Sequence, residues 1–418
     1  MSDVQLKPLG ELVRSREPGC GLPGEVFSRQ DVFDTDVDIF FNKHWIVVGV
    51  TADVPEPGDV SVVDIGKASV MIVRDDDEGI RAYRNVCRHR GARLKEAGKS
   101  TVGMLVCPYH QWTYDLDGSL RHAKHMGKDF DSTCRNLLPV HVKVVGTHVF
   151  VCFADEPPAD IAHLEETMGP RFAPYALQNT KIAFESEIVE DGNWKLVMEN
   201  NRECYHCEAG HPELTQSFLP ESTGSCADDM DEAALKAQQA YEKLNADTQA
   251  NWESEGWVCK AVEALSGDVA THFRTERLLI AGHGESQTMD TKVASRKLLG
   301  NLTRRDLGDT HMWTHNSWTH VMSDHAMISY IIPLTPEKTL VRTKWLVHAD
   351  ALEGVDYDLT KLTEVWVATN AQDASLVAIN HRGAQDPGYI PGPYSPSTEN
   401  YVDQFVDWYA GRLAAHGF

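Results

Sequence analysis

Two short stretches of the chain each combine a cysteine with a histidine. In CRHRGARL, Cys87 and His89 are separated by one residue. In CPYHQWTYDLDGSL, Cys107 and His110 are separated by two, and seventeen residues lie between the two pairs. Thiolate and imidazole are both metal ligands, so the four side chains predict a metal centre held by two loops.

Two kinds of metal centre accept this ligand set. A tetrahedral zinc ion binds two thiolates and two imidazoles, but structural zinc sites usually draw them from a pair of cysteines and a pair of histidines. Here each loop supplies one of each. That arrangement suits a two-iron, two-sulfide cluster in which both cysteines bind one iron and both histidines bind the other. We therefore predict a one-electron relay, with structural zinc as the alternative.

A second group of metal-ligand residue types follows in NWKLVMENNRECYHCEAGHPEL, where four residues separate His206 from His211. Two imidazoles and one carboxylate form the facial triad of non-haem Fe(II) oxygenases, which leaves positions open for O2 and a substrate. The carboxylate has three candidates in the sequence: Glu203, Asp373 and Asp386. Because Pro and Gly follow Asp386, a loop is expected there.

The elements around these residues predict an α+β protein. Between Trp45 and Phe153 short strand-like runs alternate with Gly, Asp and Pro turns, which predicts a small antiparallel β domain carrying both Cys/His loops. Helical runs and further strands follow, closed by the helical ENYVDQFVDWYAGRLAA. We expect an N-terminal segment (1–43), a [2Fe-2S] domain (44–154) and a catalytic domain with a mononuclear iron (155–418).

Composition excludes several classes of function. The net charge is -23, with 62 acidic and 39 basic residues, which argues against binding nucleic acid or an anionic membrane surface. The N-terminus lacks an export signal and no apolar window is long enough to span a bilayer, so we expect a cytoplasmic protein. The nine cysteines are scattered and odd in number, which favours metal ligands over a disulfide framework.

The two Cys/His loops resemble the Rieske loops of aromatic-ring-hydroxylating and related oxygenases. The resemblance includes Arg90 and Gly91 in the first loop and a CPYHGW-like second loop, in which Gln111 stands where glycine is usual. It implies that the ligands of the [2Fe-2S] cluster are Cys87, His89, Cys107 and His110.

The histidine pair also resembles this family, whose pattern is Asp/Glu-x-Tyr-His-x4-His. The resemblance implies that His206, His211 and Asp373, the last on a downstream helix, bind Fe. It gives Glu203 a different role, in which its carboxylate bridges the iron histidine of one subunit and the Rieske histidine of its neighbour, His110, so that electrons pass between subunits.

The resemblance runs from about Trp45 to the C-terminus and implies the rest of the architecture. The catalytic domain is expected to have the helix-grip fold, an antiparallel sheet around a long helix, and the protein to be a head-to-tail homotrimer. Because no Gly-x-Gly-x-x-Gly motif follows a strand, NAD(P)H and flavin are expected on a separate reductase.

Within this superfamily, the C-terminal region resembles the branch that contains choline monooxygenase, glycine betaine monooxygenase and proline betaine demethylase. This implies hydroxylation of an N-methyl group of a quaternary ammonium compound, with release of formaldehyde; glycine betaine is the first expectation and proline betaine the second. A cation that cannot donate hydrogen bonds calls for aromatic rings. Trp313, Trp318 and Tyr330 are candidates because they lie in the segment expected to line the pocket, with packing in the core as the alternative for each. The alternatives are an aromatic-ring dioxygenase that forms a cis-diol, and a Rieske electron carrier without oxygenase activity.

Overall fold

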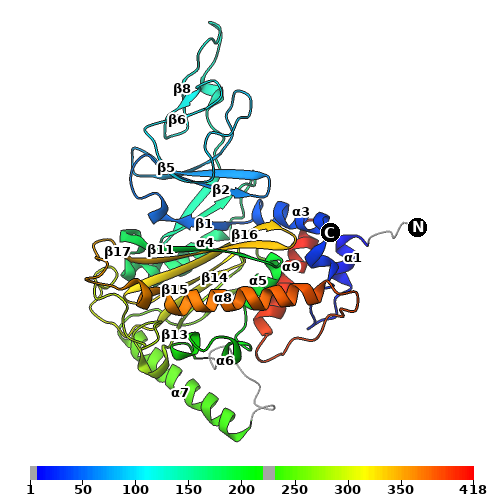
Figure 1. Ribbon diagram of the computed structural model, residues 1–418, viewed down its shortest axis with the longest axis vertical. Coiled ribbons are helices and arrows are strands. Elements are labelled where there is room, and N and C mark those ends of the chain that lie inside the picture. Colours follow the sequence, from blue (N-terminus) through cyan, green and yellow to red (C-terminus); the bar gives the residue numbers. More distant parts are fainter. Residues whose placement is uncertain (1–6, 220–230) are drawn as a thin grey trace. The chain divides into compact units, whose positions relative to one another are not determined.

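Runs rich in Val and Ile form strands over much of the chain, as their composition predicts. The structure, a computed structural model, describes residues 7–219 and 231–418. The chain forms two units, one spanning Phe40–Pro158 and the other combining the residues up to Ile39 with Ala159–Phe418. Figure 1 traces the chain through both.

The smaller unit consists of three antiparallel sheets, ordered β1-β10-β9, β4-β3-β2-β5 and β6-β7-β8. Its core joins residues of β2 and β3 to aromatic rings such as Trp112 and Tyr114, and it includes Cys87 and Cys107. The strands of this unit are β1 (Ile46–Val50), β2 (Asp59–Ile65), β3 (Ala68–Arg74), β4 (Ile80–Arg84), β5 (Gly98–Thr101), β6 (Leu105–Val106), β7 (Thr113–Tyr114), β8 (Leu120–His122), β9 (His141–Val145) and β10 (His148–Cys152).

The larger unit is built on a seven-stranded antiparallel sheet with the order β11-β17-β16-β15-β14-β13-β12. A tight turn at Pro336 and Glu337 joins two of its long strands, β16 and β17, into a hairpin. The strands are β11 (Thr180–Glu190), β12 (Val262–Ala264), β13 (Phe273–Leu278), β14 (Asp309–Thr314), β15 (Ser317–Val321), β16 (His325–Thr335) and β17 (Lys338–His348).

One long helix, α8 (Leu359–Ala384), runs across this sheet (Figure 1). The Asp358 side chain caps its first turn by accepting a hydrogen bond from the Lys361 N–H, and Pro387 follows soon after its end. In mid-helix, Asn370 Nδ2 donates to Thr343 Oγ1 of β17 at 3.0 Å. The helix therefore holds its middle turns against the sheet, and the α+β prediction is confirmed.

Shorter helices surround the sheet or precede it. They are α1 (Leu9–Arg14), α2 (Glu25–Ser28), α3 (Gln30–Asp36), α4 (Ile161–Phe172), α5 (Trp194–Asn200), α6 (Cys207–Gly210), α7 (Glu232–Ser254) and α9 (Asn400–Ala415). The α9 helix lies where the sequence predicts the closing helix.

The N-terminal helices belong to the larger unit because a buried polar cluster ties them to it. Asp36, at the end of α3, accepts hydrogen bonds from Lys195 Nζ, from Trp194 Nε1 at 3.0 Å and from the Tyr409 hydroxyl at 2.8 Å. Its carboxylate and the Lys195 ammonium are both fully buried, so each compensates the other's loss of hydration. Of the segment expected at residues 1–43, residues 7–39 are thus packed with the larger unit, and the smaller unit begins at Phe40.

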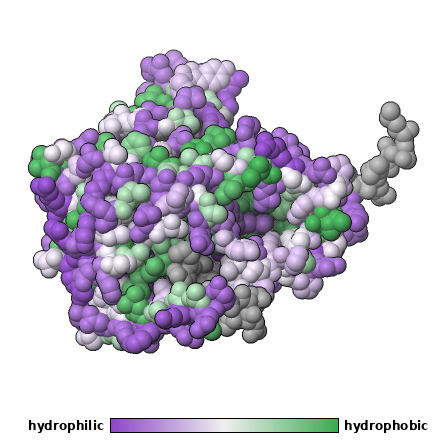
Figure 2. Space-filling view, turned by 60° about the horizontal axis from the view of Figure 1, so that its bottom comes forward, coloured by the Kyte–Doolittle hydropathy of each residue, from purple (hydrophilic) through white to green (hydrophobic). Residues whose placement is uncertain are grey.

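The surface reflects the acidic composition. The face shown in Figure 2 is largely hydrophilic, with hydrophobic residues in smaller groups. Among the residues that the structure describes, none of the helices has the length and apolar character needed to cross a membrane.

Candidate active site

The two Cys/His loops have the same kind of backbone turn. The Cys87 N–H donates to the Ala92 carbonyl at 2.8 Å, and the Cys107 N–H donates to the Trp112 carbonyl, also at 2.8 Å. Each loop therefore closes on itself five residues after its cysteine, with the histidine two residues after Cys87 in the first loop and three residues after Cys107 in the second.

The same turn requires a left-handed residue four places after each cysteine. In the first loop this residue is Gly91, with φ of 78°, and in the second it is Gln111, with φ of 60°. Glycine adopts this conformation without steric cost, whereas a residue with a Cβ does not. The departure from the usual glycine at Gln111 therefore falls on the position where glycine has a conformational reason to be.

The two cysteines and the two histidines of these loops differ in burial. Cys87 and Cys107 are 2% and 1% exposed, whereas His89 and His110 lie at the surface with ring centroids 4.7 Å apart. Burial raises the pKa of the Cys87 thiol, and the neighbouring Cys107 adds to this effect. An inner pair of thiols and an outer pair of imidazoles fit a cluster in which each iron takes two ligands of one kind.

In the larger unit, two histidines bracket the single turn of α6. Asn193 caps the preceding helix, α5, by accepting a hydrogen bond from the Lys195 N–H. His206 lies directly before α6 and His211 directly after it, and their rings meet edge to face with centroids 4.9 Å apart. The short turn thus brings both imidazoles to one point.

Asp373 of α8 completes this group. The Nε2 atoms of His206 and His211 are 3.0 Å apart, and Asp373 Oδ1 lies 3.3 Å and 3.0 Å from them. Donor atoms that bind one ion at about 2.1 Å in adjacent octahedral positions are separated by about 3 Å, so the spacing fits a facial triad. Asp386, the weaker candidate, lies beyond α8, where its carboxylate accepts the Gly388 N–H at 2.7 Å.

Hydrogen bonds at Nδ1 orient both rings. His206 Nδ1 lies 2.5 Å from Glu203 Oε1, and His211 Nδ1 lies 2.8 Å from Gln372 Oε1. Such partners fix the tautomer and leave Nε2 free to bind a metal. Gln372 was not found by sequence reasoning, although its position next to Asp373 on α8 is the one signal that points to it.

The charges of the group favour a cation at its centre. Burial lowers the pKa of His206, but hydrogen bonds to Asp373 and Glu203 outweigh it and raise the pKa to about 9. Burial raises the pKa of Asp373, but its histidine partners outweigh this and lower it. A divalent cation bound by the same nitrogen and oxygen atoms would take the place of these protons. Mononuclear iron fits this donor set.

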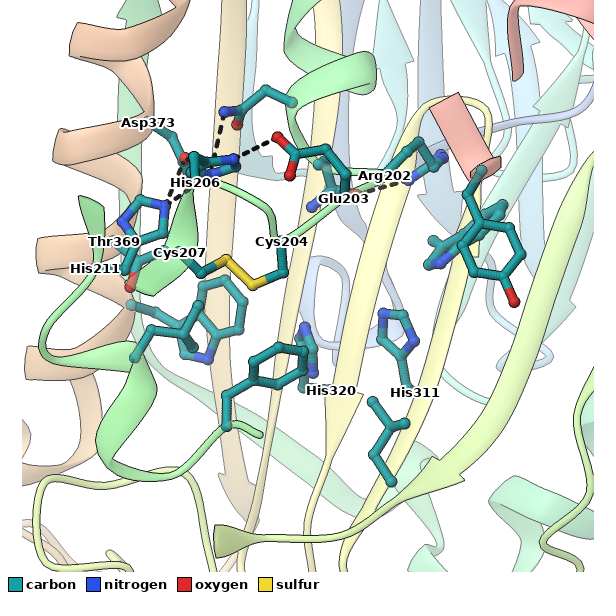
Figure 3. A pocket seen from close by; sticks show the side chains of 18 of the residues that line it. Arg202, Glu203, Cys204, His206, Cys207, His211, His311, His320, Thr369 and Asp373 are labelled. Atoms are coloured by element: carbon teal, nitrogen blue, oxygen red, sulfur yellow. Dashed lines mark hydrogen bonds and ion pairs between the residues drawn. A yellow bond between two sulfur atoms is a disulfide. The ribbon is translucent and has the colours of Figure 1, made fainter. Parts of the chain in front are cut away.

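These residues line one wall of a cavity of about 100 Å³. One water needs roughly 10–15 Å³ measured in this way, so the space suits a compact substrate. Figure 3 shows His206, His211 and Asp373 together on one side of it, with His311 and His320 below. Its aromatic lining is formed by Phe218, Trp313, Trp366 and Tyr401.

The expected aromatic residues are only partly brought to the cavity. Trp313 lines it, whereas Trp318 and Tyr330 are buried but do not belong to its walls. The rings that take their place come from helices: Trp366 from α8 and Tyr401 from α9.

A disulfide joins Cys204 and Cys207 at the edge of the cavity, with their Cα atoms 4.9 Å apart. Two residues separate these cysteines, Tyr205 and His206, so the crosslink encloses one of the triad histidines. The Cys207 sulfur lies near both histidines but is paired, and is therefore not available as a thiolate ligand. The general expectation that the cysteines are metal ligands does not hold for this pair, because local C-x-x-C spacing brings the two sulfurs together.

Comparison with known proteins gives matches over both units. A model described as the Rieske [2Fe-2S] domain matches residues 44–155, and one described as the ring hydroxylating alpha subunit (catalytic domain) matches residues 178–415. The glycine betaine monooxygenase oxygenase subunit of Chromohalobacter salexigens is 43% identical over 405 residues, 96% of this chain and 88% of that relative.

A second relative and a solved structure also match nearly the whole chain. The glycine betaine monooxygenase oxygenase subunit of Pseudomonas aeruginosa (strain UCBPP-PA14) is 40% identical over 409 residues, 97% of this chain and 92% of the relative. The crystal structure of the quaternary ammonium Rieske monooxygenase CntA has a TM-score of 0.70 at 21% identity, covering 97% of this chain and 99% of CntA. At that identity the likeness concerns the fold.

Proposed function

The chain belongs to the Rieske oxygenases, as an alpha subunit with a Rieske [2Fe-2S] domain and a ring-hydroxylating catalytic domain, and on this premise we propose that it is the oxygenase subunit of a glycine betaine monooxygenase. It is a Rieske monooxygenase that carries a [2Fe-2S] cluster and a mononuclear iron, and a reductase supplies its electrons. The observation that carries the proposal is the triad of His206, His211 and Asp373 opening into a small cavity with an aromatic lining. Similarity to two glycine betaine monooxygenases over nearly the whole chain supports the choice of substrate.

We assign the cofactor ligands by the chemistry of their donor atoms. Cys87 and Cys107, which are buried, would hold one iron of the cluster, and His89 and His110, which lie at the surface, would hold the other, so that the cluster could accept and pass on one electron at a time. In the larger unit the mononuclear iron is held by His206, His211 and Asp373.

The reaction removes one N-methyl group. Glycine betaine, O2, two electrons and two protons give dimethylglycine, formaldehyde and water. The nitrogen is quaternary and has no lone pair, so a methyl C–H bond is the reactive position; the resulting N–CH2OH group then loses formaldehyde. When bound, the iron activates O2 for this C–H hydroxylation.

The residues of the chain prepare the site for this chemistry. Glu203 and Gln372 accept hydrogen bonds from the Nδ1–H groups of His206 and His211 and so hold both Nε2 atoms toward the metal position. The aromatic rings of the cavity stabilise the trimethylammonium group, which offers no hydrogen-bond donor. They also exclude water from around the reacting methyl group.

Electron transfer assigns a second role to Glu203. In our proposal the protein is a head-to-tail homotrimer, in which Glu203 links His206 of one subunit to a neighbour's cluster ligand His110. The contact between Glu203 and His206 supplies half of this link. The proposal places the reaction in the cytoplasm, where the reductase obtains NAD(P)H.

The test is formaldehyde release by the iron-loaded protein with a reductase and NADH. Glycine betaine, proline betaine, choline and an aromatic acid are compared at equal concentrations. Formaldehyde from glycine betaine in a one-to-one ratio with dimethylglycine is the expected result. A cis-diol from the aromatic acid would instead identify an aromatic-ring dioxygenase, and cluster reduction without any product would identify an electron carrier.

A further inference from the structure

Arg202 is a buried guanidinium at the wall of the cavity. Arg202 is 3% exposed, and it directly precedes Glu203 in the segment that carries the triad histidines. NH1 donates to Asn201 Oδ1 at 2.6 Å, NH2 donates to the Thr314 carbonyl, and Nε has no partner. In the part of the chain that the structure describes, no carboxylate forms an ion pair with it. A guanidinium has five N–H groups, so two hydrogen bonds leave most of its capacity unused.

A buried charge without a counter-charge is unfavourable unless a ligand supplies one. Arginine does not lose its proton in proteins, so Arg202 remains a cation although burial lowers its pKa. The second arginine of the cavity, Arg274, is different, because Glu263 and Glu276 already bind it at 2.8 Å and 2.6 Å. Of the two arginines that line the cavity, Arg202 is thus the one that no carboxylate of the described residues binds, and its N–H groups can bind an anion.

The guanidinium plane is held in a fixed orientation. Trp313 lies beneath it, with 4.0 Å between the Arg202 Cζ and the ring centroid, and Phe405 lies 5.8 Å away. Stacking occupies the face of the group and leaves its N–H edge for a planar, two-oxygen ligand, which is how arginine binds carboxylates.

The nearby histidine of the cavity wall does not offer a negative charge. His311 also lines the cavity, its Nδ1 has no partner, and burial with the nearby charges of Arg274 and Arg202 lowers its pKa well below the usual range. His311 is therefore a neutral polar group. It can donate one hydrogen bond to a bound anion, but it cannot supply the negative charge that Arg202 lacks.

We propose that Arg202 binds the carboxylate of the substrate, and so restricts the enzyme to quaternary ammonium compounds that carry a carboxylate. The inference rests on the proposed betaine demethylation. Figure 3 shows Arg202 and the triad of His206, His211 and Asp373 on opposite sides of the pocket. A betaine whose carboxylate binds Arg202 therefore directs its trimethylammonium end toward the triad.

The experiment compares glycine betaine with choline, which has the same trimethylammonium group but a hydroxyl in place of the carboxylate. Their binding to the full-length, metal-loaded protein is measured by calorimetry under argon, followed by kcat and KM for each. In Arg202→Gln we expect the affinity for glycine betaine to fall about 100-fold and the affinity for choline to change less than about threefold. Arg202→Lys, which keeps the charge but not the fork, should recover part of the loss.

Arg171 provides a matched control. It is 2% exposed, its Nε and NH1 have no partner, and it lies outside the cavity. Arg171→Gln removes an equally buried guanidinium, so it should lower the thermal stability but leave the ratio of the two affinities unchanged.

Each outcome decides the proposal. An unchanged affinity ratio in both Arg202 variants overturns it, as does a wild-type protein that does not bind glycine betaine. Wild-type binding that depends on Arg202 but yields no formaldehyde would keep the carboxylate site and overturn the proposed reaction. If Arg202→Gln does not fold, Arg202→Lys alone decides, with a loss of at least about tenfold expected for glycine betaine.

Discussion

Glu203 Oε1 lies 2.5 Å from Nδ1 of His206, and this contact determines which nitrogen of the ring faces the metal position. The same carboxylate accepts the Tyr205 N–H through its other oxygen. The acid is therefore tied to the triad segment by both oxygens, and an amide of the same shape, which keeps an acceptor for His206, separates its orienting role from the role of its charge.

We expect Glu203→Gln to retain both metals but to lose turnover by at least about 100-fold, because an amide keeps the acceptor for His206 but not the charge. Iron content, the absorbance of the cluster and the rate of cluster reoxidation with substrate and O2 are measured together. Glu208→Gln, a change of an exposed acid in the same segment, is the control and should behave as the wild type. Wild-type turnover in Glu203→Gln would refute the role of this carboxylate in electron transfer.

Asp373→Asn should remove the mononuclear iron while sparing the cluster. The amide has no negative charge to compensate a divalent ion, and we expect iron affinity to fall by at least about tenfold. Iron is counted per subunit after gel filtration, with cluster absorbance as the internal reference. Asp386→Asn tests the other candidate and should retain both metals; the reverse result would move the third ligand to Asp386.

Glu190 gives a prediction on pH. Burial, with a smaller contribution from Asp373, raises the pKa of this carboxyl to about 8. In the unfolded chain the group ionises near pH 4.3, so between about pH 4.3 and 8 the unfolded state loses its proton while the folded state keeps it. Stability from this group is therefore present at low pH and is lost as the pH rises toward 8.

Glu190→Gln removes this dependence. We expect the variant to be more stable than the wild type by about 5 kcal/mol at pH 8.5 and to differ little at pH 4.5. Urea unfolding of the larger unit at both pH values measures it. Glu187→Gln, a change in a half-exposed ion pair of the same strand, should stay within about 1 kcal/mol at both. A difference for Glu190→Gln that does not grow with pH contradicts the raised pKa.

The second Cys/His loop offers a prediction on stability. Gln111 has φ of 60°, so Gln111→Gly should relieve about 1 kcal/mol of strain and raise the melting temperature of the smaller unit by a few degrees. Gly91→Ala, at φ of 78° in the first loop, should do the opposite. Gly103→Ala, at a position without positive φ or close neighbours, serves as the reference. A lower melting temperature in Gln111→Gly would indicate that the glutamine side chain stabilises the loop.

The disulfide gives a last prediction. Because it closes only a very short loop, its effect on overall stability is expected to be small, but it encloses His206. We expect Cys204→Ser/Cys207→Ser to bind Fe(II) about tenfold more weakly with little change in melting temperature, as measured by anaerobic titration. Cys134→Ser, a change of an exposed free cysteine, is the control. Equal affinities would show that the crosslink has no part in positioning the histidine.

The local motifs could be predicted from the sequence because the chemistry is encoded in their spacing. The Cys87/His89 and Cys107/His110 pairs are of this kind, and so are the two histidines around α6. Asp373 lacks such a signal, because only folding brings α8 against α6. It was predicted from family resemblance, and the structure places it beside both histidines.

The lining of the cavity could not be predicted in the same way. Strands β14 and β15 are buried on both faces. Their sequences therefore do not alternate between polar and apolar residues, and such an alternation is what would show whether Trp313 or Trp318 lies on the face of the sheet that meets the cavity. Trp366 and Tyr401 reach it from helices far along the chain. Arg202, in the turn between α5 and α6, was also missed, because a single arginine in a sequence carries no sign that it has no carboxylate partner.

The unit from Phe40 to Pro158 begins and ends in the same place. The Phe153 N–H donates to the Asn42 carbonyl at 2.9 Å, and Trp45 Nε1 donates to the Pro158 carbonyl at 2.8 Å. Since the chain on either side of it belongs to the other unit, this electron-carrying module is a single insertion in the sequence of that unit. It is thereby suited to transplantation: a chimaera that receives a relative's module needs only two junctions, both at one site, and leaves the substrate cavity of the recipient unaltered.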